Sequence, residues 1–175
     1  QIQIHTENIF PIIKKAVYSG HEVFLRELVS NGTDAISKRR MAAMAGDCSE
    51  ADEGSINIKV DREAKTVTIS DNGIGMTADE VKRYINQVAF SSAEDFLEKY
   101  KQESDAIIGH FGLGFYSSFM VAKEVELITR SARPDSEAVR WVCDGSPAFK
   151  LESHDRTEAG TDVILHLMDD ELEYL

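Results

Sequence analysis

The fold is decided by residues 66–76, which read Thr66-Val67-Thr68-Ile69-Ser70-Asp71-Asn72-Gly73-Ile74-Gly75-Met76. The first half alternates polar and apolar residues and predicts a strand, and residues 55–61 alternate in the same way before a charged turn, so the two predict a hairpin. Asp71 then ends the second strand, where its carboxylate can accept a hydrogen bond while the two glycines let the backbone pass close to a flat ligand. The alternative is an ordinary turn, because Asn-Gly is a strong turn dipeptide.

On both sides of this hairpin the pattern is mixed. Apolar periodicity and Gly signals predict helices at 7–19, 21–44, 79–87, 93–101 and 114–122, and strands at 124–130, 138–143, 148–152 and 161–168. The second helix is expected to end before Gly46. Helices interleaved with antiparallel strands predict an α+β fold, a two-layer α/β sandwich with helices on one face of a mixed, mostly antiparallel sheet.

The helix at 21–44 carries a polar stripe. At about 100° per residue, Glu27, Asn31 and Asp34 lie within roughly 60° of one another at the edge of the apolar arc. The alternative is a solvated helix side with Asp34 and Lys38 as an i,i+4 pair. An interior Gly32 favours the stripe as a site, because such a glycine costs about 1 kcal/mol relative to alanine and indicates a close approach.

A third cluster reads Gly109-His110-Phe111-Gly112-Leu113-Gly114 and precedes a predicted helix. Bare glycine amides at a helix N-terminus favour anions such as phosphate. The spacing is neither the dinucleotide fingerprint nor a P-loop, so alone it is a weak signal. The three clusters together predict an ATP site that supplies a base, a metal ligand, an adenine acceptor and a phosphate cradle.

Composition narrows the class of protein. The 175 residues, 42% hydrophobic and 29% charged, suit one globular domain spanning 1–175. A net charge of -12 disfavours nucleic acid as a partner, and no apolar run approaches the ~20 residues of a membrane span, so we expect a cytoplasmic protein. The two cysteines are isolated in the sequence, which favours reduced thiols over a disulfide or a zinc site.

The ends of the sequence are abrupt. Gln1–Ile4 is strand-like and Asp169–Leu175 looks like a helix start, and together they suggest a fragment of a longer protein.

Five segments carry a resemblance to a known family. They are Thr6–Phe10, Phe24–Asn31, Asp71–Met76, Ile108–Ser117 and Asp169–Leu175. In these segments the chain resembles the N-terminal ATP-binding domain of the heat-shock protein 90 chaperones, of the bacterial high-temperature protein G type. The resemblance covers essentially the whole chain. It implies the Bergerat fold shared with type II topoisomerases, mismatch-repair ATPases and sensor histidine kinases, and a slow ATPase that assists protein folding in the stress response.

The resemblance also implies roles for individual residues. Glu27 would be the catalytic general base that activates the attacking water, and Asn31 would bind both the nucleotide and Mg²⁺. Asp71 would accept the adenine amino group, with Thr161 assisting through water. The remaining implied nucleotide contacts are Asp34, Gly75 and Met76 at the base and Gly112, Gly114 and Phe115 at the phosphates.

Residues of about 85–113 would form a mobile lid, and here the sequence departs from the family pattern. Phe90 stands in place of a usual lysine, Ser92 in place of a glycine and His110 in place of a glutamine. Lys38 or Lys82 could replace the missing lid cation, although an exposed helix lysine is the simpler interpretation. In the family an arginine from the next domain completes the γ-phosphate environment, so this fragment is expected to hydrolyse ATP slowly.

Partners and alternatives follow from the same resemblance. It implies unfolded or client proteins as partners of the full-length chaperone, which would be a homodimer through a distant domain, while this piece alone is expected to be a monomer. A sensor-kinase or topoisomerase-type ATPase shares the pocket. A non-enzymatic, nucleotide-gated interaction module is the other alternative. The five histidines show no phospho-acceptor setting and are expected to be structural.

Overall fold

The structure is a computed structural model, and it describes residues 23–49, 53–83, 118–119, 121–144 and 149–175. A long helix, α2, spans Val23–Met44. The strands are β1 (Ile56–Asp61), β2 (Thr66–Asp71), β3 (Ala122–Arg130), β4 (Ala138–Cys143), β5 (Phe149–His154) and β6 (Gly160–Leu167). A 3-10 helix, η2, follows at Asp169–Tyr174.

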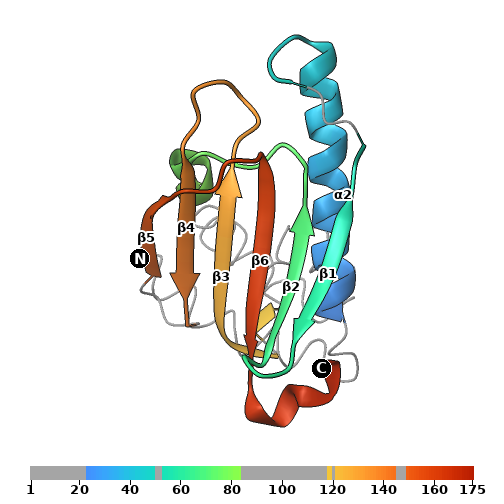
Figure 1. Cartoon of the computed structure of the whole chain (residues 1–175), viewed down its shortest axis with the longest axis vertical. Helices are drawn as coiled ribbons and strands as arrows, with labels where there is room; N and C mark the ends of the chain where they lie inside the picture. Colours follow the sequence, from blue (N-terminus) through green and yellow to red (C-terminus); the bar gives the residue numbers. More distant parts are fainter. Residues whose placement is uncertain (1–22, 50–52, 84–117, 120, 145–148) are drawn as a thin grey trace, which may run out of the picture.

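The strands form one six-stranded sheet in the order β1-β2-β6-β3-β4-β5 (Figure 1). The predicted hairpin is confirmed, because β1 pairs antiparallel with β2 and Ile58 lies opposite Ile69. β6, from the end of the chain, lies between β2 and β3 and pairs antiparallel with both. Every described ladder is antiparallel, so the parallel component that we expected in a mixed sheet does not occur among the described strands.

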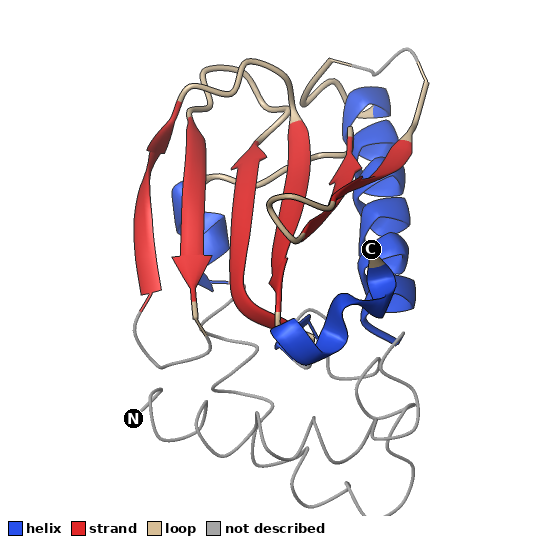
Figure 2. Cartoon of the chain, turned by 60° about the horizontal axis from the view of Figure 1, so that its bottom comes forward, coloured by secondary structure: helices blue, strands red, loops and turns tan. Residues whose placement is uncertain are grey.

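Helix α2 covers one face of the sheet, so the predicted α+β fold with helices on one side is confirmed (Figures 1 and 2). The core lies between the two layers. Phe24 and Leu28 of α2 are buried there, and their full burial contributes roughly 1.5–3 kcal/mol each. The sheet contributes alternate residues of its central strands, which include Val67, Ile69, Val125, Leu127, Val163, Leu165 and Leu167.

The end of α2 follows from local chemistry. Gly46 has a φ of +82°, Asp47 N–H donates to Ala42 O at 2.9 Å, and Gly46 N–H donates to Ala43 O at 3.0 Å. These two bonds are those of a Schellman motif, which satisfies the last carbonyls of a helix. The predicted stop at Gly46 is therefore confirmed.

Other predicted bounds differ in detail. Residues 78–83 are helical, and Thr77 and Glu80 form a reciprocal capping box before them, so the helix predicted at 79–87 starts where expected. The helix predicted to run through 122 is wrong at its end, because β3 already begins at Ala122, where buried Val121 and Ala122 join the core. The helix start at Asp169 is a 3-10 helix, with Leu172 and Leu175 packed on the core.

The strand expected at 1–4 and the helices expected at 7–19 and 93–101 lie outside the described residues. In the part of the chain that the structure describes, no helix is both long enough and apolar enough to cross a bilayer.

Candidate functional site at the end of strand β2

Asp71 ends β2 as predicted, and its side chain is partly buried. Gly73 N–H donates to Asp71 Oδ1 at 2.8 Å, which is an Asx turn made by the Asp71 side chain, so the alternative of a turn at these residues is confirmed. Burial raises the pKa of Asp71 to about 6. The backbone N–H groups of Gly73 and Thr161 and the positive charge of Arg156 oppose this shift by favouring the ionised carboxylate.

Thr161 lies directly opposite Asp71 in the β2–β6 ladder, and its hydroxyl belongs to a buried threonine pair. Thr129 Oγ1 lies 2.8 Å from Thr161 Oγ1 and donates to Gly160 O at 3.1 Å. A hydroxyl has one hydrogen, and Thr129 gives its hydrogen to a carbonyl. Thr161 is therefore the donor within the pair, and its own oxygen keeps acceptor capacity beside Asp71.

The loop after Asp71 packs tightly on the end of β3. Gly75 has a φ of +64°, and a Cβ there would lie 1.9 Å from Arg130 O, so only glycine fits. Met76 N–H donates to Thr129 Oγ1 at 3.0 Å, and Ala132 N–H donates to Ile74 O at 2.7 Å. These bonds hold Gly75, Met76 and Thr161 around one buried hydroxyl.

Helix α2 contacts the same loop. A Cβ on Gly32 would lie 3.4 Å from Asp71 Cβ and 3.2 Å from Ile56 Cδ1, so the close approach predicted for this interior glycine is confirmed. Ile74 N–H donates to Ala35 O at 2.9 Å, and Gly73 is buried against Ala35. The structure thus brings the first two sequence clusters together.

The polar stripe of α2 lies beside these contacts. Glu27 is half-buried, whereas Asn31 and Asp34 are exposed. Asn31 directly precedes the buried Gly32 in α2. The amide oxygen of Asn31 and the carboxylates of Glu27 and Asp34 are hard donors of the kind that Mg²⁺ accepts.

Several predicted site residues lie outside the described residues. They are Gly112, Gly114 and Phe115, together with the lid positions Phe90, Ser92 and His110. Lys38 and Lys82, the two candidates for a replacement lid cation, are exposed.

Three features of the site were missed by the sequence analysis. Thr129 is fully buried and connects β3, β6 and the glycine loop. A polar residue at a core-facing position of the alternating run Val125, Leu127, Thr129 was the signal that could have identified it. Arg39 donates to Asn72 O at 2.9 Å and thereby joins α2 to the loop.

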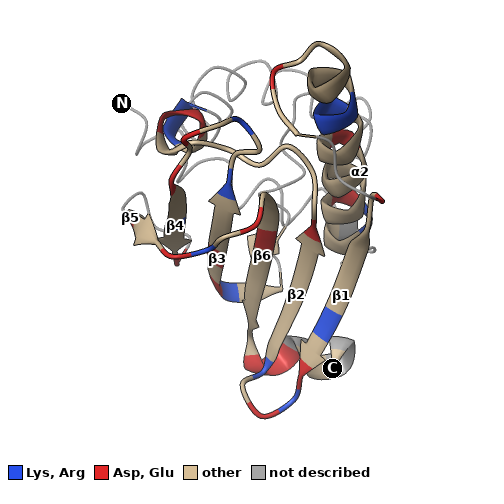
Figure 3. Ribbon diagram, turned by 45° about the horizontal axis from the view of Figure 1, so that its top comes forward, with Lys and Arg blue, Asp and Glu red and all other residues tan. Residues whose placement is uncertain are grey.

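The third missed feature is the ion pair between Arg156 and Asp162, whose nearest atoms lie 2.9 Å apart close to Asp71. Along the described ribbon, segments with Lys or Arg and segments with Asp or Glu both occur on the helix, the strands and the loops (Figure 3).

Comparison with known proteins gives an independent result. A family model described as "Histidine kinase-, DNA gyrase B-, and HSP90-like ATPase" matches residues 18–148. The chaperone protein HtpG of Bacteroides thetaiotaomicron is 56% identical over 174 residues, which are 99% of this chain and 25% of that protein. HtpG of Porphyromonas gingivalis strain W83 is 53% identical over 175 residues, covering 99% of this chain and 26% of the relative.

A more distant HtpG, from Streptomyces coelicolor, is 43% identical over 180 residues, covering 99% of this chain and 28% of the relative. The chain thus spans about a quarter of the length of these curated relatives. The family model covers most of the chain, and the three relatives are chaperones, as the resemblance in the sequence motifs predicts. The chain therefore belongs to the family of histidine kinase-, DNA gyrase B- and HSP90-like ATPases, and its predicted likeness to the ATPase domain of the HSP90 chaperones is confirmed.

Proposed function

We propose that this chain is the ATP-binding domain of an ATP-dependent molecular chaperone, and that it binds ATP or ADP with Mg²⁺ and hydrolyses ATP slowly on its own. One observation carries the proposal. A partly buried carboxylate, Asp71, ends β2 beside the acceptor oxygen of Thr161 and a loop whose Gly75 position admits only glycine, within a chain of this ATPase family.

The chemistry of Asp71 favours adenine over guanine. Oδ1 accepts the Gly73 N–H, and a carboxylate has about four lone-pair sites, so the group keeps acceptor capacity for a ligand. The adenine N6 amine is a donor, whereas guanine places its O6 acceptor at the equivalent position and would meet the carboxylate with repulsion. Thr161 offers a second acceptor, directly or through water, and Asp34, Gly75 and Met76 would line the base.

Hydrolysis would take place at the other end of the nucleotide. Glu27, as general base, would orient the attacking water and accept its proton, a role that requires a carboxylate within hydrogen-bond reach. Asn31 would hold Mg²⁺ through its amide oxygen, and a bound Mg²⁺ would neutralise phosphate charge. Gly112, Gly114 and Phe115 would approach the phosphates. An arginine contributed from outside this chain would complete the site.

Replacement of Glu27 by alanine tests this assignment. Turnover should fall by about 10²–10⁴-fold, because general base catalysis contributes that much, while nucleotide affinity stays nearly unchanged. Phosphate release measures the first quantity and isothermal titration calorimetry the second. Glu63→Ala, on the exposed β1–β2 turn, is the matched control and should change neither. An equal loss of affinity in Glu27→Ala would reject the base assignment, and nucleotide binding without turnover in the wild type would favour a nucleotide-gated interaction module.

The raised pKa of Asp71 predicts that ADP affinity depends on pH. A protonated carboxyl group is a poorer hydrogen-bond acceptor for the adenine amine than a carboxylate. The ADP affinity should therefore rise by about tenfold per pH unit up to about pH 6 and level off above it. Phosphate groups also titrate near pH 6. The Asp71→Asn variant loses the titration of the carboxyl group but keeps that of the phosphates. Below about pH 6, the ADP affinity of the wild type should therefore rise about tenfold more per pH unit than the affinity of the variant. Equal slopes in the two proteins would contradict the role of Asp71.

Partners are inferred at a coarser level. We infer that unfolded client proteins bind the longer chaperone of which this chain is a part, that the longer protein is a cytoplasmic homodimer, and that this piece alone is a monomer. The acidic charge of -12 supports the absence of nucleic acid from this set, because it would repel a phosphate backbone.

A further inference from the structure

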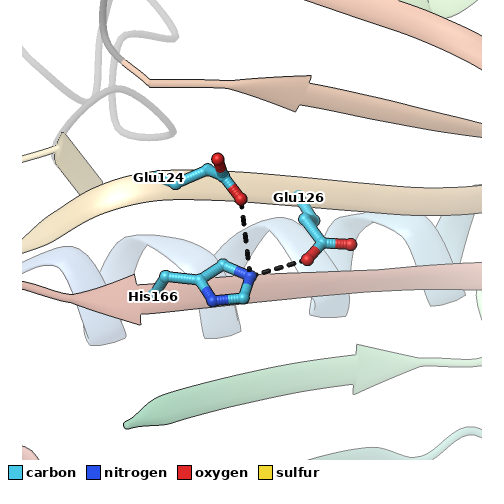
Figure 4. Close-up of side chains that lie close together, drawn as sticks. All are labelled: Glu124, Glu126 and His166. Atoms are coloured by element: carbon cyan, nitrogen blue, oxygen red, sulfur yellow. Dashed lines mark hydrogen bonds and ion pairs between the residues drawn. The ribbon is translucent and has the colours of Figure 1, made fainter. Parts of the chain in front are cut away.

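Three potential metal ligands lie together on the face of the sheet opposite α2. Glu124 and Glu126 project from β3 and His166 from β6, and in Figure 4 all three side chains stand in front of the strands while a helix runs behind. The β3–β6 ladder is irregular between Ala122 and Glu124, after which Glu124 lies directly opposite His166. The three residues take no part in the nucleotide site proposed above.

One imidazole nitrogen faces both carboxylates. His166 Nε2 lies 2.6 Å from Glu126 Oε1 and 3.8 Å from Glu124 Oε1. A single N–H can satisfy one of these oxygens, and the distance to Glu124 is too long for a hydrogen bond. In this arrangement Glu126 bonds to the imidazole ring and Glu124 does not.

We propose that Glu124, Glu126 and His166 bind Zn²⁺. Their three donor atoms lie within 4.8 Å of one another, and a zinc ion with bonds of about 2.0–2.2 Å joins donors that are up to about 4 Å apart, so small side-chain movements close the site. Water would complete a tetrahedral set. The two carboxylates balance the charge of Zn²⁺, and the imidazole binds in its neutral form. The ion takes the place of the proton that His166 Nε2 and Glu126 Oε1 share in their hydrogen bond.

The surroundings of Glu126 already orient it for this role. Its second oxygen, Oε2, accepts a bond from Arg140 Nε at 2.9 Å, and Arg140 continues to Glu152 at 2.7 Å. Metal-binding carboxylates are commonly held by such outer hydrogen bonds, and Oε1 remains available to the ion. Glu126 is the least exposed of the three side chains, at 14%, so it anchors the group, while Glu124 at 42% leaves an entry path from solvent.

The donor set distinguishes among metals. Imidazole with carboxylates suits zinc and related transition metals, whereas Mg²⁺ and Ca²⁺ prefer all-oxygen ligands. Zn²⁺ binding here should therefore be independent of Mg²⁺ and of nucleotide.

Calorimetric titration of the untagged chain with zinc chloride tests the proposal, first without nucleotide and then with excess Mg²⁺. The wild type should bind one Zn²⁺ that excess Mg²⁺ does not displace. His166→Gln and Glu124→Gln should each weaken this binding roughly 100-fold or more, because loss of even an outer-shell partner costs 10–100-fold. The matched control is His154→Gln, on β5, which removes an exposed histidine outside the group and should leave the affinity unchanged.

Two further readouts separate the metal site from a simple ion-pair network. Glu124 has no other described bond, so Glu124→Gln should fold normally, as circular dichroism will show, and remains decisive if His166→Gln does not fold. In NMR spectra, Zn²⁺ should shift the His166 ring Nε2 signal. Two results would overturn the proposal and leave only an ion-pair network. One is an unchanged zinc affinity in both Glu124→Gln and folded His166→Gln, and the other is displacement of Zn²⁺ from the wild type by excess Mg²⁺.

Discussion

Asp71→Asn is expected to weaken ADP binding about 100-fold, the largest effect on affinity of any single change in the described site. The loss corresponds to one hydrogen bond to a charged group together with an unfavourable contact, about 2–3 kcal/mol. The asparagine oxygen would keep the Gly73 N–H bond that Oδ1 accepts now. Its NH₂ group would then point at the adenine amine, donor against donor, where Oδ2 accepts in the wild type.

Folding and binding can be separated in this variant. The pKa of Asp71 is raised from 3.8 to about 6 in the folded chain, so this group favours the folded state below about pH 4 and loses that contribution as the pH rises through about 6. At pH 8 Asp71→Asn should therefore be at least as stable as the wild type in urea. Asp79→Asn, an exposed aspartate in the next helix, is the matched control for calorimetry. Wild-type affinity in Asp71→Asn would eliminate Asp71 as the base receptor.

Gly75→Ala is expected to lower the free energy of unfolding by about 2–5 kcal/mol, the largest effect on stability. A positive φ costs a non-glycine residue roughly 1–2 kcal/mol, and forced overpacking adds about 1–3 kcal/mol. The new methyl group would lie 1.9 Å from Arg130 O, which belongs to backbone at the end of β3 and cannot simply rotate away. The loop must move, and the Met76 N–H bond to Thr129 should be lost with it.

The chain offers a control that isolates backbone strain from the clash. Gly46 also has a positive φ, but no atom lies within 4 Å of a Cβ placed there. Gly46→Ala should therefore cost only about 1–2 kcal/mol. Urea denaturation of both variants measures the difference, and ADP titration should show weaker binding in Gly75→Ala alone. Equal losses of stability would show that the close approach to β3 is unimportant.

Much of the fold was predictable because it depends on neighbours in the chain. Alternation located β1, β2 and the later strands to within two residues, and Gly46 marked the end of α2 through bonds that span only a few residues. The wrong bound is the end of the helix expected at 114–122, because β3 already begins at Ala122, where the chain joins the core. The helix expected from Asp169 starts there as a 3-10 helix, and its Leu172 and Leu175 pack on the core.

The candidate site divides in the same way. The sequence by itself determined that Asp71 ends a strand, that Gly73–Met76 is a glycine loop, and that Glu27, Asn31 and Asp34 share one side of a helix, because turn chemistry and helical periodicity are local. The tertiary structure alone decided that β6 separates β2 from β3 and places Thr161 opposite Asp71. It also decided that Thr129 binds the loop, that Gly32 contacts Asp71, and that His166 meets two carboxylates. The residues in these contacts lie 39–90 positions apart in the chain. They meet only through the order and register of the strands, which depend on burial of the whole core rather than on any short stretch of sequence.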